Sequence, residues 1–269
     1  MSIRTLADAQ DRSVIHGIFS QGATPSPAPQ LVILVGAPGV GKTSQIGKLV
    51  TGSFYYVSLD RLVEQVQPYR IMTKLVYDEM KKRRPLTEVD YALLHDAYMA
   101  TARSRDNMFD SSHTAHRILD KMNGIVREKE KAPPSTYHTL IELRKQGLED
   151  GMEQGLDIIY DTTFSSTKNI MKEDILPLLE KQKVTYQVRV IHVTASEEQI
   201  RQQLEERHEN MVKEGYIRAI GPQRIKKFIR ENQEGSEIAE RYCMEYHTMH
   251  PLTRYTPDRF TFETYENIR

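Results

Sequence analysis

The chain has 269 residues, and its 37 basic and 37 acidic side chains leave no formal net charge. This balance excludes a global positive field of the kind that draws a protein onto nucleic acid, although a local basic patch is compatible with it. The single cysteine, Cys243, cannot form a disulfide within the chain and suits a reducing compartment. No apolar run is long enough to span a membrane, and the N-terminus is too polar for a secretory signal. We therefore expect a cytoplasmic protein with no membrane partner.

The order of hydrophobic and polar segments predicts an α/β protein. An amphipathic helix over 5–19 and a Pro-rich linker over 23–30 form an N-terminal arm, 1–30, ahead of one large domain, 31–269. Short apolar runs separated by helical patterns indicate a parallel sheet with helices on both faces. The runs predict strands at 31–35, 53–58, 156–160, 186–193 and 259–265.

A long charged segment, 69–155, separates the second predicted strand from the third. Its pattern is mostly helical, and it is longer than a simple crossover requires. Because long excursions from the carboxyl end of a parallel sheet commonly build ligand sites, we expect a helical insertion there that contributes to a binding site.

The clearest motif in the chain follows the first predicted strand. The pattern G-x-x-x-x-G-K-[ST] is met by Gly36, Gly41, Lys42 and Thr43, between an apolar run and a helical pattern. Glycines let the backbone curl its N–H groups around an anion, and the following helix adds its positive N-terminal end. Lys42 places a cation on the outer phosphates, and the Thr43 hydroxyl is suited to bind Mg²⁺. The motif predicts a P-loop NTPase fold that binds a nucleotide through Gly36, Ala37, Pro38, Gly39, Val40, Gly41, Lys42, Thr43 and Ser44.

Two aspartates each close a predicted strand. Parallel strands end at one edge of a sheet, the edge that carries the phosphate loop, so we expect Asp60 and Asp161 to lie near the nucleotide. Asp161 is suited to hold Mg²⁺, directly or through water; the competing interpretation is an aspartate that caps a turn. The residue after it is Thr162 rather than an acidic residue that would orient water, which disfavours an ATP-driven motor.

Asp60 is the candidate general base. A carboxylate at the end of the second strand can take the proton from an acceptor hydroxyl. Its neighbour Arg61 is suited to pair with a carboxylate or to bind a substrate phosphate. The competing interpretation is a helix-capping aspartate beside a solvated arginine.

A polar helical stretch over 197–232 follows the fourth predicted strand and begins with a capping signature, Ser196 to Gln199. Arginines held over a transferring phosphoryl group stabilise its negative charge, and a helical lid can deliver them while excluding water. The alternative is a solvated helix face with Glu–Arg pairs. The arginines of this stretch are Arg201, Arg207, Arg218 and Arg224.

Taken together, four segments resemble the zeta-toxin and polynucleotide-kinase group of P-loop kinases. They are "GAPGVGKTS", "SLDRL" with "QPY" soon after, "DIIYDTTFSS" and "LEERHENMVKEGYIRAI", and they lie within 31–232. The resemblance implies that Lys42 and Thr43 hold the phosphates of ATP or GTP with Mg²⁺, and that Asp60 is the general base. It also implies that Arg207 and Arg218 are lid arginines.

The same resemblance assigns Thr163, after the third strand, to substrate binding. Zeta-toxin-like kinases often carry an arginine shortly after this threonine, whereas here the segment reads Phe164-Ser165-Ser166. The favoured acceptor is the hydroxyl of a small molecule such as a nucleotide sugar, and this departure keeps the 5′-hydroxyl of a nucleic acid as the alternative.

Two other kinds of protein stay open on the sequence alone: an ATPase of an assembly or packaging machine, and a P-loop protein that binds nucleotide only as a structural switch. Cys243, His247 and His250 have the spacing C-x₃-H-x₂-H of three metal ligands. No fourth ligand is evident, so we assign no zinc site.

Overall fold

The computed structural model of the chain describes residues 12–20, 22–65, 73–74, 91, 94–95, 98, 140–163, 170–214, 220–250 and 254–267. The chain divides into two compact units, each built from three segments. The first unit comprises 1–18, 59–144 and 204–221, and the second comprises 19–58, 145–203 and 222–269. The predicted division into an arm and a kinase domain follows the chain order instead, and it stays a prediction.

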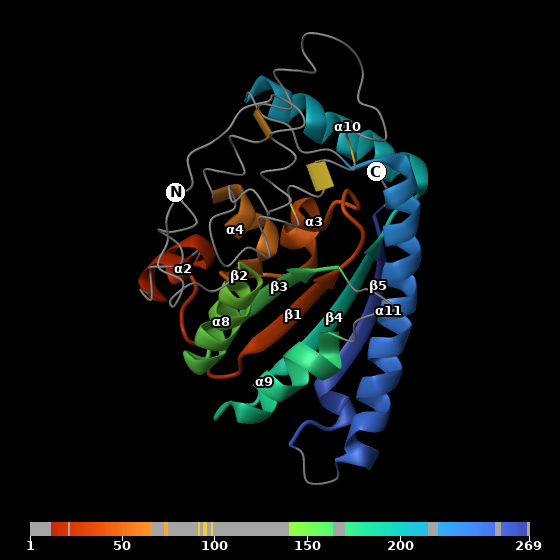
Figure 1. The fold of residues 1–269 in the computed structure, drawn as a ribbon. Helices are drawn as coiled ribbons and strands as arrows, with labels where there is room; N and C mark the ends of the chain where they lie inside the picture. The colour runs from red at the N-terminus through yellow and green to blue at the C-terminus, as the bar shows by residue number, and fades with distance from the viewer. Residues whose placement is uncertain are drawn as a thin grey trace, which may run out of the picture. The chain divides into compact units, whose positions relative to one another are not determined.

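The second unit contains a five-stranded parallel sheet in the order β2-β3-β1-β4-β5 (Figure 1). This confirms the predicted α/β fold with a parallel sheet. The side chains of the central strand are buried along 31–35, as a strand covered on both faces requires. The strands are β1 (Gln30–Val35), β2 (Tyr55–Ser58), β3 (Ile158–Thr162), β4 (Gln187–Thr194) and β5 (Phe260–Glu266).

Two strands, β2 and β3, begin two residues later than the hydrophobic pattern predicts. β3 begins at Ile158 because Leu156 forms an isolated antiparallel bridge with Pro25 instead of joining the sheet. β2 begins at Tyr55, whose backbone N–H donates to the Asp157 carbonyl at 2.9 Å. Hydrophobicity marks these residues as buried, whereas pairing decides where the ladder starts.

Helices surround the sheet within the second unit. Gly151 of α8 lies so close to β2 that a Cβ there would meet the Tyr55 ring at 2.8 Å. The Tyr246 hydroxyl of α11 donates to Glu180 of α9 at 3.4 Å, and Phe19 packs edge-on against Tyr55 with ring centroids 5.8 Å apart. Over both units together, the helical elements apart from α4 are α2 (Arg12–Phe19), α3 (Lys42–Leu49), α8 (Leu140–Glu153), η1 (Met171–Ile175), α9 (Leu176–Lys181), α10 (Glu197–Lys213), α11 (Pro222–Met249) and η2 (Pro257–Arg259).

The first unit contains α4 (Leu59–Gln65), which starts as soon as β2 ends. Asp60 therefore lies in the first turn of a helix and does not close the strand, which corrects the sequence prediction. In the segment 69–155, helix is described at 73–74, 91, 94–95 and 98 and in α8. The rest of the predicted insertion, and 5–11 of the predicted N-terminal helix, lie outside the described residues.

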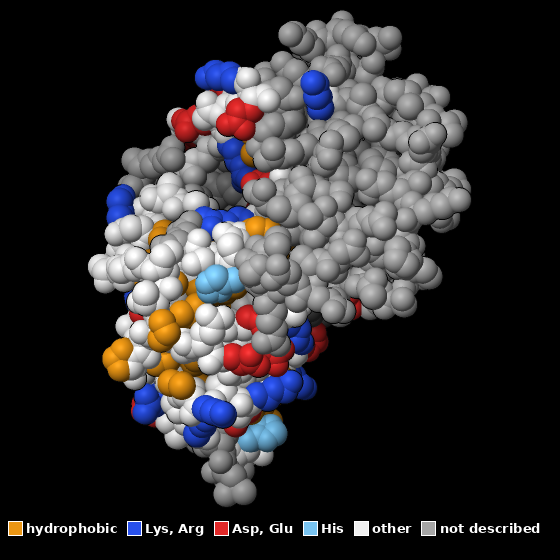
Figure 2. Space-filling view, turned by 90° about the vertical axis from the view of Figure 1, so that its left-hand side faces the viewer, with side chains coloured by type: hydrophobic (Ala, Val, Ile, Leu, Met, Phe, Trp, Pro, Cys, Tyr) orange, Lys and Arg blue, Asp and Glu red, His pale blue; other side chains and the backbone are white. Residues whose placement is uncertain are grey.

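Basic and acidic side chains are interspersed over the described part of the face in Figure 2. That face therefore carries no broad patch of one sign in the described residues, in agreement with the balanced composition. Among the helices of the described residues, none has the length and apolarity needed to cross a membrane.

Candidate active site

The phosphate loop lies at the point where the sheet reverses its winding. The chain leaves β1 toward the edge that β2 forms, and it leaves β4 toward the opposite edge that β5 forms. The carboxyl ends of neighbouring strands whose connections diverge in this way border the crevice in which open α/β sheets bind ligands. Residues 36–41 connect β1 to α3 at this point.

Close packing explains the glycines of the loop. A Cβ on Gly36 would lie 2.6 Å from the Val193 carbonyl oxygen and 2.8 Å from Cγ2 of Val40. Gly39 and Gly41 have φ angles of 86° and 85°, in the left-handed region that other residues rarely adopt. The loop then enters α3 without a side-chain cap at its N-terminus, where backbone N–H groups attract anions.

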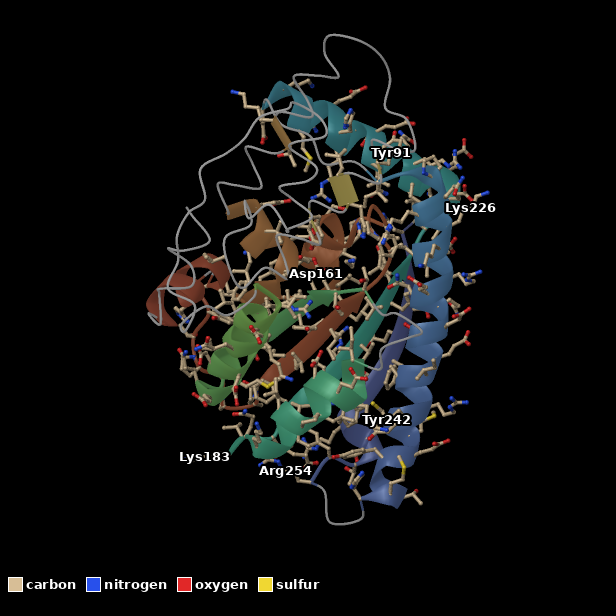
Figure 3. The ribbon with its side chains drawn as sticks, in the orientation of Figure 1. Tyr91, Asp161, Lys183, Lys226, Tyr242 and Arg254 are labelled. Atoms are coloured by element: carbon tan, nitrogen blue, oxygen red, sulfur yellow. The ribbon has the colours of Figure 1, made fainter. Side chains whose placement is uncertain are left out.

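The loop lysine is held over the carboxyl ends of two strands. Lys42 Nζ donates to the Gly36 carbonyl at 2.6 Å and lies 3.4 Å from Oδ1 of Asp161. Asp161 is the penultimate residue of β3 (Figure 3). Oδ2 of its carboxylate accepts a hydrogen bond from the Tyr56 hydroxyl at 2.7 Å. Both side chains of the ion pair are largely buried, at 12% and 13% exposure. Sequence reasoning paired neither Lys42 nor Tyr56 with Asp161.

The donor set at this point fits a magnesium ion. Mg²⁺ prefers oxygen ligands and usually takes only one or two from the protein, since phosphate and water supply the others. The exposed Thr43 hydroxyl and the Asp161 carboxylate are oxygen donors of this kind. Because both Asp161 oxygens already have partners in Lys42 and Tyr56, contact through a water suits this carboxylate best.

A buried histidine lies beside the lysine. His192 of β4 is paired with Val35 in the sheet and is 8% exposed. Burial lowers the pKa of His192 from its ordinary value of 6.5, and the nearby Lys42 cation lowers this pKa further against an opposing effect of Glu237. Its environment therefore favours the neutral imidazole beside the phosphate loop.

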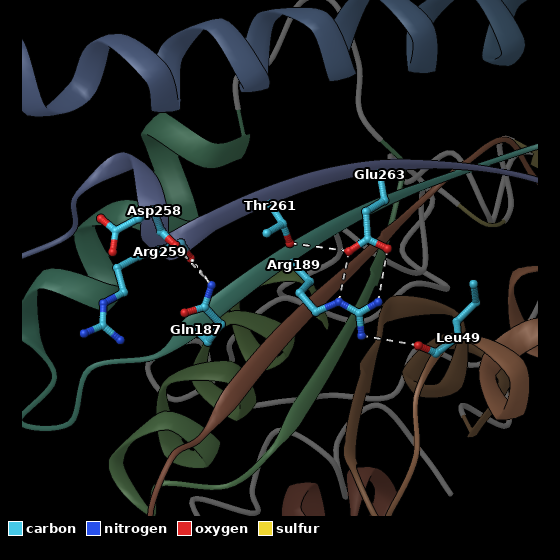
Figure 4. A network of polar contacts seen from close by, with 7 residues as sticks. All are labelled: Leu49, Gln187, Arg189, Asp258, Arg259, Thr261 and Glu263. Atoms are coloured by element: carbon cyan, nitrogen blue, oxygen red, sulfur yellow. Dashed lines mark hydrogen bonds and ion pairs between the residues drawn. The ribbon is translucent and has the colours of Figure 1, made fainter.

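The helix after the loop is tied to the sheet at its far end (Figure 4). Arg189 of β4 donates from Nη1 to the Leu49 carbonyl of α3 at 3.3 Å. The same guanidinium binds both carboxylate oxygens of Glu263 on β5 at 3.1 Å. This bidentate contact fixes the orientation of the guanidinium. The C-terminal end of α3 is thereby anchored to β4 and β5.

In the first unit, the candidate base has a hydrogen-bond partner that the sequence did not reveal. The Tyr98 hydroxyl donates to Oδ1 of Asp60 at 2.6 Å, a short bond of the kind that an ionised acceptor makes. Tyr98 belongs to the helical residues of the segment 69–155, and no motif singles it out. Arg61, predicted to bind substrate, is half-buried beside Asp60 on α4.

A second contact in the same unit joins the predicted lid to α4. Arg207 of α10 donates from Nη2 to Oε1 of Glu64 at 3.3 Å. Glu64 follows Asp60 by one helical turn, and residues four apart share a helix face. Arg207 is therefore held beside the face of α4 that carries the candidate base.

The other arginines of 197–232 differ from Arg207. Arg201 pairs with Glu197 one turn earlier at 2.6 Å and is exposed, as the solvated-face interpretation predicts. Arg224 lies over the Phe228 ring, 5.6 Å from its centroid. Arg218 lies outside the described residues.

The start of α10 confirms the predicted capping signature. The Ser196 hydroxyl accepts from the Gln199 backbone N–H at 3.2 Å, and the Gln199 side chain accepts from the Ser196 N–H at 2.9 Å. This reciprocal pair satisfies two donors at the helix N-terminus.

Thr163 is half-buried just after β3, and the segment 164–166 lies outside the described residues. Cys243, from the C-x₃-H-x₂-H spacing to which no zinc site is assigned, is buried in α11, where burial raises the pKa of its thiol to about 12. His250 packs against Tyr246 with ring centroids 4.6 Å apart. Among the described residues, no three His, Cys, Asp or Glu side chains are grouped to hold a metal ion.

Comparison with known proteins finds a matching family model and a resemblance to solved structures. Residues 31–220 match the model of the AAA domain family. A solved structure of the PezAT chromosomal toxin–antitoxin system of the human pathogen Streptococcus pneumoniae is 14% identical to this chain, with a TM-score of 0.47, over 98% of this chain and 77% of that one. Both values are too low for the resemblance to bear on activity. No curated protein matches the chain.

The family match covers most of the chain, from β1 through the phosphate loop and Asp60 to the segment with Arg207. It agrees with the likeness of the four motifs to the zeta-toxin and polynucleotide-kinase group. The chain belongs to the AAA domain family and has the nucleotide-binding, kinase-like core of that P-loop group.

Proposed function

We propose that the protein is a kinase that transfers the γ-phosphate of ATP or GTP to a hydroxyl of a small molecule, such as a nucleotide sugar. The observation that carries this proposal is the phosphate loop at the switch point of the sheet, with Lys42 and Asp161 in contact there. The AAA domain match supports the nucleotide-binding part. The choice of phosphate transfer over hydrolysis rests on Asp60 and on Thr162.

At the nucleotide, residues 36–44 bind the phosphates through backbone N–H groups. Lys42 exchanges its contact with Asp161 for the outer phosphates, which are stronger acceptors for a cation. Magnesium, held by Thr43 and by Asp161 through water, would neutralise the charge that develops on the phosphate oxygens. Asp161 keeps its place on β3 through the hydrogen bond from Tyr56.

At the acceptor, Asp60 takes the proton of the substrate hydroxyl. The oxygen of that hydroxyl forms a bond to the γ-phosphorus, and the bond between this phosphorus and the bridging oxygen breaks, so that the nucleoside diphosphate leaves with the electron pair. Tyr98 orients the Asp60 carboxylate for this step through its 2.6 Å hydrogen bond. Arg61 and Thr163 contact the bound acceptor.

Arg207 and Arg218 stabilise the negative charge that spreads over the transferring group. The Glu64 contact supports this role for Arg207, because it directs the guanidinium toward the face of α4 that carries Asp60. An ion pair at 38% and 28% exposure is weak, and Arg207 can exchange it for phosphate oxygens at small cost.

Two alternatives have specific observations against them. An ATPase of an assembly machine would need a group to orient water, and the residue after Asp161 is the buried Thr162. A 5′-hydroxyl polynucleotide kinase would need cationic surface for the strand, and the balanced composition of the chain supplies no global positive field. The second alternative is the closer one, since it uses the same groups.

The test is to incubate the protein with γ-labelled ATP or GTP and three acceptor classes: nucleotide sugars, 5′-hydroxyl oligonucleotides and a protein extract. We expect label on the nucleotide sugars and slow hydrolysis without an acceptor. Label on the oligonucleotide selects the alternative kinase. Rapid hydrolysis with no labelled acceptor in any class would overturn the kinase proposal in favour of an ATPase.

A further inference from the structure

Asn267, which follows the last strand, reaches the phosphate loop. Its backbone N–H donates to the Thr194 carbonyl at 2.8 Å, so it continues the attachment of β5 to β4. Its side chain is buried, with 1% exposure of the residue, and Nδ2 donates to the Val40 carbonyl at 2.9 Å. A residue 227 positions away in the chain thus holds a carbonyl inside the loop.

A relay of hydrogen bonds holds this amide on its other side. The Tyr265 hydroxyl donates to Oε1 of Gln45 at 3.3 Å, and Nε2 of Gln45 donates to Oδ1 of Asn267 at 2.9 Å. Gln45 is itself 5% exposed on α3. Since the Val40 carbonyl can only accept, the nitrogen of Asn267 must face the loop, and its oxygen faces the Gln45 donor.

The loop is shaped to accept this contact. A Cβ on Gly41 would lie 2.6 Å from Nδ2 of Asn267, closer than any side chain allows. Gly41 therefore serves the approach of Asn267 as well as the left-handed turn into α3.

A planar trans peptide points its carbonyl and its N–H in opposite directions. The peptide between Val40 and Gly41 is trans, so Asn267, by holding the Val40 carbonyl, directs the Gly41 N–H away from itself. We propose that Asn267 is a positioning residue: it holds this peptide so that the Gly41 N–H faces the bound phosphates. This inference rests on the proposed binding of a nucleotide by the loop.

The experiment compares nucleotide affinities of Asn267→Leu with those of the wild type. ADP and GDP are first tested on the wild type, and the tighter ligand is used with its monophosphate. The Leu variant lacks the buried donor that orients the phosphate-binding N–H. Its affinity for the diphosphate should fall by about tenfold, and its affinity for the monophosphate should fall by less than about twofold. Asn267→Asp, which keeps the shape but lacks the donor, should show the same selective loss.

Asn232 provides a matched control. It is also 1% exposed, and its Nδ2 also donates to a backbone carbonyl, that of Phe228 within α11, at 2.7 Å. Asn232→Leu should lower the melting temperature, but it should not selectively lower the affinity for the diphosphate. Tyr265→Phe removes only the outermost hydroxyl of the relay. This variant should fold and should bind the diphosphate about twofold more weakly than the wild type.

Equal losses of diphosphate and monophosphate in the Asn267 variants, or wild-type affinities in them, would overturn the inference and leave the proposed function standing. If the wild type binds neither diphosphate, the proposed function fails and the inference fails with it. Wild-type affinity in Tyr265→Phe, with unfolded Asn267 variants, would assign Asn267 to stability and would also overturn the inference.

Discussion

The two units of the molecule hold their candidate functional residues in different ways. In the sheet unit, Asp161 and the phosphate loop are continuous with strands whose backbone ladders run from β2 to β5. In the other unit, Asp60 and Arg207 lie on the helices α4 and α10, and the contacts described for their side chains come from Tyr98 and Glu64. Backbone register survives most substitutions, whereas one substitution removes a side-chain contact.

This difference separates binding from transfer. We expect substitutions at the loop to change how tightly a nucleotide is held, and substitutions at Asp60, Tyr98 or Arg207 to change the rate of transfer at nearly constant nucleotide affinity. The following variants test that separation.

Lys42→Ala should have the largest effect. The loss of a cation from the transferring phosphoryl group should lower transfer by about 10⁴-fold, which lies within the roughly 10³–10⁵ that an arginine finger contributes by stabilising the same charge. Nucleotide affinity should fall as well, which a titration with the diphosphate measures. Lys48→Ala, in the last turn of the same helix, is the control and should keep wild-type turnover. Normal turnover in Lys42→Ala would refute an active kinase.

Asp60→Asn should lower transfer by about 10³-fold, within the usual contribution of a positioned general base. Nucleotide affinity should stay nearly unchanged, because Lys42, the loop and magnesium supply it. Single-turnover transfer and nucleotide titration measure the two quantities separately. If nucleotide binding collapses while transfer from each bound nucleotide is normal, Asp60 is a metal or structural residue, and Asp161 becomes the next candidate base.

Arg207→Ala should lower kcat by about 10- to 100-fold with little change in KM, if the guanidinium acts only on the transition state. Arg201→Ala is the matched control, because Arg201 lies on the same helix but is exposed and pairs with Glu197. A change in KM alone would place Arg207 in ground-state binding. If both variants have equally negligible effects, the interpretation of Arg207 as part of a solvated helix face is favoured.

Two tyrosines allow a direct comparison of the units. Tyr56 and Tyr98 each donate a hydroxyl to an aspartate, at 2.7 and 2.6 Å respectively. Tyr98→Phe should lower kcat by about fivefold, and Tyr56→Phe should raise the magnesium concentration needed for half-maximal rate by a similar factor. Kinetics at varied magnesium distinguish the two effects. The same kinetic change in both variants would contradict the separation of binding from transfer.

The smallest expected effect concerns pH. Burial lowers the pKa of His192 in the sheet unit and of His208 in the other unit. A histidine with a lowered pKa in the folded state takes up its proton more readily when unfolded. The free energy of unfolding should therefore fall as the pH drops below about 6.5.

Denaturant titrations at about pH 8 and about pH 5.5 measure this loss, and His192→Gln and His208→Gln should each reduce it. The sign is decisive, since greater stability at the lower pH would show that the histidines gain protons on folding.

Local pattern in the sequence sufficed for the parallel α/β fold, the phosphate loop and the cap of α10, because apolar runs, glycine spacing and a capping pair act over a few residues. Its errors were local too. Periodicity placed Leu156 in β3 and Asp60 at a strand end, since hydrophobicity reports burial and not hydrogen-bond partners.

Only the tertiary structure decided which side chains meet. Tyr98 reaches Asp60 across 38 residues, and Asn267 reaches Val40 across 227, and no spacing rule connects positions so far apart. The sequence by itself determined that a phosphate loop is present and what lies beside it in the chain. The packing of distant segments decided the partners of Lys42, of Asp60 and of the Val40 carbonyl. A hydrogen bond needs contact in space, and the order of residues in the chain does not specify that contact.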